Sequence, residues 1–132
     1  IATNGGTGQT GAALLTPIVA QPRFRVLGTG AWPLPMSASL SQLLAGRGEN
    51  QWVEVRAIVR SVTNQAGRLE ITIAQSGIKM KTWVPGFTGF PIPANLVDSS
   101  VRIQGVSGAR LDGRGQLSCF HLVGPGLDKI AV

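Results

Sequence analysis

From residue 51 onward the sequence alternates apolar and polar residues with a period of two. A strand over residues 52–62 would place four small apolar side chains on one face and mostly charged ones on the other. The same alternation returns over residues 68–74 and 78–84. Because successive side chains of a strand point to opposite faces of the sheet, this pattern predicts strands with one buried face. The alternation therefore favours a β-sheet protein over a helical one.

The order of the predicted strands narrows the choice of fold. After the first three strands comes a Pro- and Gly-rich connection over residues 85–99, followed by strands over residues 101–106 and 117–123. Asp112-Gly113 is a hairpin signal between these two strands, and residues 127–132 would add a short edge strand. This order predicts an all-β, five- to six-stranded OB-like Greek-key barrel. A six-stranded SH3-like or sandwich arrangement is the alternative, because periodicity does not fix topology.

The segment before the strands has a different character. Residues 1–11 contain almost nothing to bury and predict a flexible lead-in. Four prolines in residues 12–36 exclude a helix and predict an extended arm, in which residues 23–27 alternate as in a strand. Trp32 is expected to anchor this arm to the body. We therefore expect residues 1–36 to form a lead-in and arm and residues 37–132 to form the OB-like domain, with core strands over residues 51–124.

One short helix is predicted over residues 39–45. Ser39 and Gln42 have the spacing of a capping box, and the leucines that follow make one apolar face. Gly46 stands where a helix commonly ends in a left-handed residue.

The residues that carry most catalytic and metal chemistry are scarce. The chain has one Cys, one His and six acidic residues. Cys119 and His121 lie two residues apart on one predicted strand, so they provide two ligands where a structural zinc site needs four. A nucleophilic pair would need them to face each other from separate elements. We therefore expect no enzymatic activity, no metal site and no cofactor.

The charge balance favours anionic partners. Twelve Lys and Arg against six Asp and Glu give a net charge of +6, although no more than two basic residues stand together. Such a charge suits nucleic acid, acidic ligands or an anionic lipid surface. No apolar stretch reaches the roughly 18 residues that a membrane span needs.

Aromatic and basic residues gather on the outer face of the first three strands. This candidate ligand face comprises Trp52, Arg56, Arg60, Arg68, Lys79, Lys81 and Trp83, with Arg110 and Arg114 at its rim. Rings beside cations suit single-stranded nucleic acid or an oligosaccharide. The alternative, which we favour from the sequence, is that the two tryptophans pack under the amino-terminal arm and leave a solvated basic face. A separate loop with Phe87, Phe90 and Ile92 would either dock a neighbouring domain or close the barrel mouth.

Several ordered phrases after residue 21 are similar to a known family. They are Arg23–Gly28, Pro33–Pro35, Leu43–Arg47, Gln51–Val62, Gly67–Ile71, Leu96–Leu117 and Pro125–Val132. These segments resemble the extracytoplasmic OB-like region of some bacterial membrane-bound sensor histidine kinases and related signalling proteins.

The resemblance implies a sensory or scaffolding input module of a two-component signalling protein. Its partners would be other domains of the parent protein, and an anionic small molecule would be its candidate ligand. The resemblance also implies an extracytoplasmic location, with a cytoplasmic one as the alternative. Because OB-like units occur in tandem in such proteins, the resemblance also implies, as an alternative to a simple arm, that residues 12–36 are the tail of a preceding repeat unit. It supplies no ligand-binding residues. A nucleic-acid-binding OB domain is the second functional hypothesis.

Overall fold

The computed structural model describes residues 2–3, 17–88, 91–111 and 113–132. Two short strands, β1 (Ala2–Thr3) and β2 (Pro17–Ile18), pair antiparallel apart from the main sheet. An extended arm then leads to β3 (Met36–Ser37) and to the helix α1 (Leu40–Leu44). Among the described residues, no helix has the length and apolar character that crossing a membrane would require.

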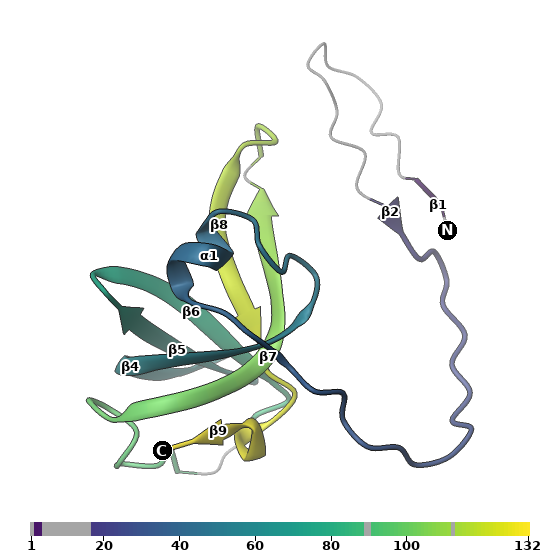
Figure 1. Ribbon diagram of the computed structural model, residues 1–132. Coiled ribbons are helices and arrows are strands. Elements are labelled where there is room, and N and C mark those ends of the chain that lie inside the picture. The colour runs from purple at the N-terminus through teal and green to yellow at the C-terminus, as the bar shows by residue number, and fades with distance from the viewer. Residues whose placement is uncertain (1, 4–16, 89–90, 112) are drawn as a thin grey trace.

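Five longer strands form a closed barrel (Figure 1). They are β4 (Trp52–Gln65), β5 (Arg68–Gln75), β6 (Ile78–Pro85), β7 (Ser100–Leu111) and β8 (Leu117–Val123). The sheet order is β4-β5-β6-β8-β7, and a further pairing of β4 with β7 closes it. β6 and β8 run parallel, whereas the other neighbouring barrel strands run antiparallel. This topology is that of the OB fold, which confirms the predicted fold class.

The barrel closes because β4 serves two neighbours. Residues 52–58 of β4 pair with β7, and residues 58–65 pair with β5. The register shifts between Val59 and Ser61, where the two pairings meet. A bulge of this kind bends a strand and increases its twist, so it lets one strand belong to both sides of the barrel.

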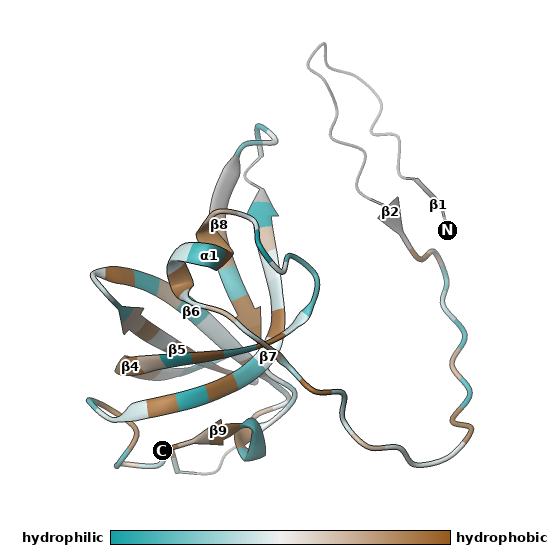
Figure 2. Ribbon diagram, viewed as in Figure 1, coloured by the Kyte–Doolittle hydropathy of each residue, from teal (hydrophilic) through white to brown (hydrophobic). Residues whose placement is uncertain are grey.

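The core side chains of β4 and β5 are those that the alternation assigned to the inner face. Val53, Val55 and Val59 of β4 are fully buried, as are the three apolar residues of β5 that the pattern assigned inward. Figure 2 shows the same alternation of hydrophobic and hydrophilic residues along β7. Leu40 and Leu43 of α1 join this core cluster. Burying these side chains removes apolar surface from water, which is the main force that holds such a barrel together.

Two hairpin turns fix the register of the barrel strands. Gln65 pairs with Arg68, and the two residues between them, Ala66 and Gly67, have φ values of 48° and 78°. The β5–β6 connection through Ser76-Gly77 has the same two-residue form. Two positive φ angles in succession are typical of the turn that matches strand twist. The first hairpin loop is therefore shorter than predicted, because residues 63–65 belong to β4.

The predicted helix is confirmed together with its cap. The Ser39 side chain accepts a hydrogen bond from the backbone N–H of Gln42, and the Gln42 side chain accepts one from the Ser39 backbone. Gly46 has a φ of 82°. Gln75 ties the helix to the barrel, since it accepts a bond from the Leu40 N–H at 2.7 Å and donates one to the carbonyl of Arg56 at 2.8 Å.

The amino-terminal arm differs from one expectation. Residues 22–35 contain no strand, and Phe24 and Val26 are each 89% exposed. Prolines flank this segment, and no neighbouring strand among the described residues pairs with it, so its alternation alone does not create a strand. Trp32 does anchor the arm, because its ring stacks on Trp52 at a centroid distance of 5.1 Å, with Lys129 above it at 5.0 Å.

The remaining segments complete the barrel ends. A 3-10 turn, η1 (Leu127–Lys129), precedes β9 (Ile130–Ala131), which pairs with β7, so the predicted edge strand is shorter than residues 127–132. In the loop after β6, Phe87 is buried and Ile92 packs against the core. These two residues therefore close the barrel and do not form an exposed docking patch. Phe90 lies outside the described residues.

Candidate ligand-binding face

A groove with a volume of about 790 Å³ crosses the outer face of β5, β6 and β8. Its lining includes Arg68, Glu70, Lys79, Lys81, Trp83 and Arg110. Leu44 of α1 and Phe120 of β8 are among its apolar walls. We call it the Trp83 groove. It brings five of the nine predicted face residues to one place.

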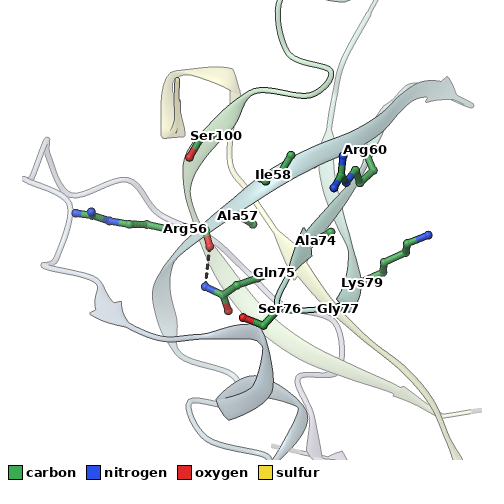
Figure 3. Close-up of a pocket in the computed structure, with 10 residues that line it drawn as sticks. All are labelled: Arg56, Ala57, Ile58, Arg60, Ala74, Gln75, Ser76, Gly77, Lys79 and Ser100. Atoms are coloured by element: carbon green, nitrogen blue, oxygen red, sulfur yellow. Dashed lines mark hydrogen bonds between the residues drawn. The ribbon is translucent and has the colours of Figure 1, made fainter.

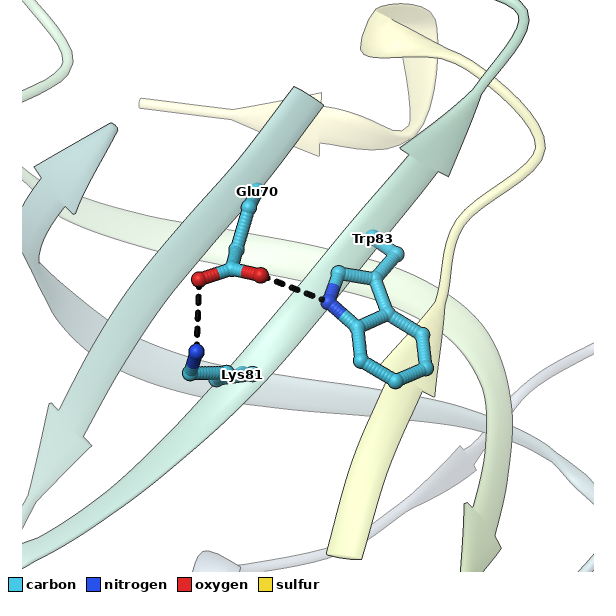
Figure 4. Close-up of polar contacts among 3 residues, drawn as sticks. All are labelled: Glu70, Lys81 and Trp83. Atoms are coloured by element: carbon cyan, nitrogen blue, oxygen red, sulfur yellow. Dashed lines mark hydrogen bonds and ion pairs between the residues drawn. The ribbon is translucent and has the colours of Figure 1, made fainter. Parts of the chain in front are cut away.

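Glu70 organises the centre of this groove (Figure 4). Its carboxylate accepts a hydrogen bond from Lys81 Nζ at 2.7 Å and one from Trp83 Nε1 at 3.2 Å. The bond from Lys81 lowers the pKa of Glu70; burial acts in the opposite direction, and the bond from Trp83 lowers the pKa further. The sequence pattern placed Glu70 on the outer face, but its neighbours cover it to 9% exposure. The carboxylate is therefore a structural anchor for two residues of the candidate face.

The Trp83 ring is bracketed by side chains from the strands on either side of β6. The guanidinium of Arg68, on β5, lies 4.7 Å from the ring centroid. The imidazole of His121, on β8, stacks on the ring at 4.5 Å with an interplanar angle of 26°. A guanidinium over an indole is a favourable contact. Arg68 is partly buried, and its guanidinium covers part of the Trp83 ring.

Gly108 gives His121 its place. The two residues are partners in the β7–β8 register, and a Cβ on Gly108 would lie 2.9 Å from His121 Nε2. His121 Nδ1 is buried and has no hydrogen-bond partner among the described residues. Burial lowers the pKa of His121, and the charge of Arg110 lowers it further. Both effects favour the neutral form of the imidazole.

A second groove, of about 390 Å³, lies on the outer face of β4 and β5 (Figure 3). Ala57, Ile58 and Ala74 are among its lining residues, and Arg56 lies on one side with Arg60 and Lys79 on the other. We call it the Arg56 groove. Lys79 borders both grooves, so the two are neighbours around the barrel.

Two predicted face residues lie elsewhere. Trp52 is covered by Trp32 of the arm, as the alternative hypothesis expected, and its Nε1 is buried with no partner among the described residues. Trp83 differs from that hypothesis, because among the described residues its stacking and cation–π partners, His121 and Arg68, both belong to the barrel. Arg114 is exposed in the turn between β7 and β8.

Sequence reasoning missed the roles of Glu70, Gly108 and His121. The spacing of strands β5 and β6 could have paired Glu70 with Lys81 or Trp83, since all three were assigned to one face. The contact between Gly108 and His121 depends on the β7–β8 register, which the sequence does not fix.

Within the described residues, no group of three or more His, Cys, Asp or Glu side chains is placed to hold a metal ion.

The barrel topology and the position of the Trp83 groove define the chain as an OB-fold domain. Solved aspartyl-tRNA synthetases contain a similar fold. The one from Entamoeba histolytica superposes with a TM-score of 0.53 and 15% identity over 89% of this chain and 28% of the enzyme. A Leishmania major Friedlin protein described as an aspartyl-tRNA synthetase gives 0.51 and 9% over 81% of this chain and 22% of that protein.

The chain therefore spans less than a third of either synthetase. At these identities the likeness establishes the fold alone. No family model matches the sequence, and no curated protein matches it.

Proposed function

We propose that this OB-fold domain binds single-stranded nucleic acid in the Trp83 groove, and that it acts by binding and not by catalysis. The groove lies over the second and third barrel strands, β5 and β6, and reaches the β4–β5 hairpin at Gln65 and Arg68. OB folds commonly bind oligonucleotides and oligosaccharides with this face and the adjoining loops. The two synthetases of similar fold are named for tRNA, a nucleic acid, which is consistent with this proposal.

The charge of the groove supports an anionic strand over a neutral oligosaccharide. Among the residues that the structure describes, four cations line it, against the single carboxylate of Glu70. That carboxylate is engaged by Lys81 and Trp83. Among the described residues, Arg68, Lys79 and Arg110 form no ion pair. Lys79 and Arg110 are therefore available to phosphates, whereas the guanidinium of Arg68 lies over the Trp83 ring.

The stack at Trp83 supplies a surface for a base. Single-stranded nucleic acids stack their bases on aromatic rings or on the plane of an arginine guanidinium. A base could lie on the outer side of the Arg68 guanidinium, or replace that guanidinium on the Trp83 ring and leave it free to meet a phosphate. Both arrangements use the same pair of side chains, and this pair is the observation on which the proposal mainly depends.

Fluorescence anisotropy with a labelled oligothymidylate at low and raised salt tests this function. We expect saturable binding that weakens steeply with salt, because each phosphate contact releases a counterion. Arg68→Gln should weaken binding by about tenfold, or about 1.4 kcal/mol. The matched control is Arg25→Gln, which removes the same charge from the exposed arm and should bind as the wild type does. Absence of binding at low salt would contradict the proposal.

A second proposal follows from the resemblance of residues 23–132 to sensor kinases. In it, the domain is a sensory or scaffolding input module, outside the cytoplasm, of a two-component signalling protein. The contact of Trp32 with Trp52 and Lys129 favours this second proposal. The contact joins the segment that enters the barrel to the segment that leaves it, as a module between other domains would require. The full-length gene product tests it: a membrane span and a downstream kinase core would support this proposal, and their absence would oppose it.

A further inference from the structure

The outer face of β4 carries an arrangement of charge that fold stability alone does not favour. Arg56 on β4 and Arg102 on β7 are direct partners in the antiparallel register, and both are exposed. Side chains that face each other in this way have Cβ atoms about 5 Å apart, and like charges there are destabilising. The closed barrel thus places two exposed arginines side by side on its outer face.

No described acid relieves this pair. Arg56 and Arg102 have no carboxylate within ion-pair distance among the described residues. Glu54 is the acid nearest to them by register, and it accepts a hydrogen bond from Gln104 at 2.9 Å. An anion from outside the chain would relieve the repulsion between the two arginines.

The Arg56 groove continues this basic surface toward the Trp83 groove. Arg60 and Lys79 border it on the side away from Arg56 (Figure 3). Arg60 pairs with Asp98 at 3.2 Å, but both side chains are more than half exposed, so that ion pair is weak and can be exchanged for a phosphate. The floor is apolar, with Ile58 39% exposed. Lys79 then belongs to both grooves.

We propose that the Arg56 groove and Arg102 form a second phosphate-binding site, which takes the part of a single strand that continues beyond the Trp83 groove. This inference rests on the proposed function, and it adds the path and the length of the ligand. The strand would pass over Lys79 and then across β5 and β4 to the arginine pair. Short oligonucleotides would fill the Trp83 groove alone, and longer ones would occupy both.

Binding as a function of oligonucleotide length tests this site. We would compare labelled oligothymidylates of about 4 and about 16 nucleotides, the range over which OB folds bind single strands. The variant is Arg56→Gln with Arg102→Gln, and the matched control is Arg23→Gln with Arg25→Gln, which removes two charges from the exposed arm.

The wild type should bind the long oligonucleotide more tightly than the short one. The Arg56→Gln, Arg102→Gln variant should bind the long oligonucleotide about tenfold more weakly and the short one with unchanged affinity. Its salt dependence on the long one should decrease by about 1.4 in slope, or about 0.7 for each phosphate that the variant no longer neutralises. Its melting temperature should be equal to that of the wild type or higher, because a repulsive pair is removed.

Four results would overturn the inference. The variant could bind the long oligonucleotide as the wild type does. Its affinity could fall equally for both lengths, or the arm control could weaken binding as much, which would indicate a general effect of net charge. If the wild type bound neither length at low salt, the proposed function itself would fail, and this inference with it.

Discussion

Replacing Glu70 with Gln should change stability and binding in opposite directions. The carboxylate is 11% exposed in its side chain and accepts bonds from Lys81 and Trp83. Gln has a single acceptor oxygen, so one of the two donors would face the new NH₂ group. The variant keeps the size of the side chain and removes one negative charge from the centre of the Trp83 groove.

The expected loss of stability follows from these contacts. A hydrogen bond to a charged group contributes about 1.5 to 3 kcal/mol. Lys81 is 54% exposed, so water replaces part of its bond and the contribution is smaller. We expect Glu70→Gln to lower the free energy of unfolding by about 1 to 2 kcal/mol. For a domain of this size, that lowers the melting temperature by about 5 to 10 °C.

Binding should improve in the same variant. Removal of a charge a few ångströms from a phosphate is worth about 0.7 kcal/mol in a solvent-exposed groove, or about threefold in affinity. Calorimetry and anisotropy on one preparation measure both effects, and Glu49→Gln, in an exposed turn, controls for net charge. A Glu70→Gln variant that melts like the wild type, or that binds oligothymidylate more weakly, would refute this account of Glu70.

Three further predictions concern the barrel and the arm. The lowered pKa of His121 means that the unfolded chain takes up its proton first, so stability should fall as the pH drops below about 6.5, and His121→Phe should remove this step in urea unfolding. Gly108→Ala should cost about 1 to 3 kcal/mol, because its Cβ would displace His121, and the loss should be smaller in a His121→Ala background. Trp32→Ala should cost about 0.5 to 1.5 kcal/mol and expose Trp52 to a fluorescence quencher, whereas Leu34→Ala, at a side chain 96% exposed, should change neither.

The sequence predicted the barrel strands well because burial on one face imposes a period of two. Val53, Ile71 and Met80 all lie inside, where the alternation placed them. The helix cap at Ser39 was equally predictable, since its partners are three residues apart. Such signals are local, and the closed barrel reinforces them.

The candidate site was less predictable, because it depends on register and on distant partners. The pattern gave Trp52 and Trp83 the same surroundings, but the arm covers the first and the barrel residues bracket the second. The sequence favoured a candidate face whose tryptophans both lie under the arm. Because the arm covers Trp52 alone, the Trp83 groove remains a candidate for ligand binding. The expectation of strand-like structure over residues 23–27 was wrong. An extended segment becomes a strand only where a neighbouring strand supplies hydrogen-bonding partners.

The central claim is that the Trp83 groove binds a single strand of nucleic acid. Titration of ¹⁵N-labelled protein with unlabelled oligothymidylate at low salt, followed by two-dimensional NMR, tests it most directly. The account predicts saturable shifts in the Trp83 indole N–H and in the backbone amides of β5, β6 and β8, with no shift in the exposed arm around Phe24. A spectrum that does not change, or one whose changes are confined to the arm, would contradict it.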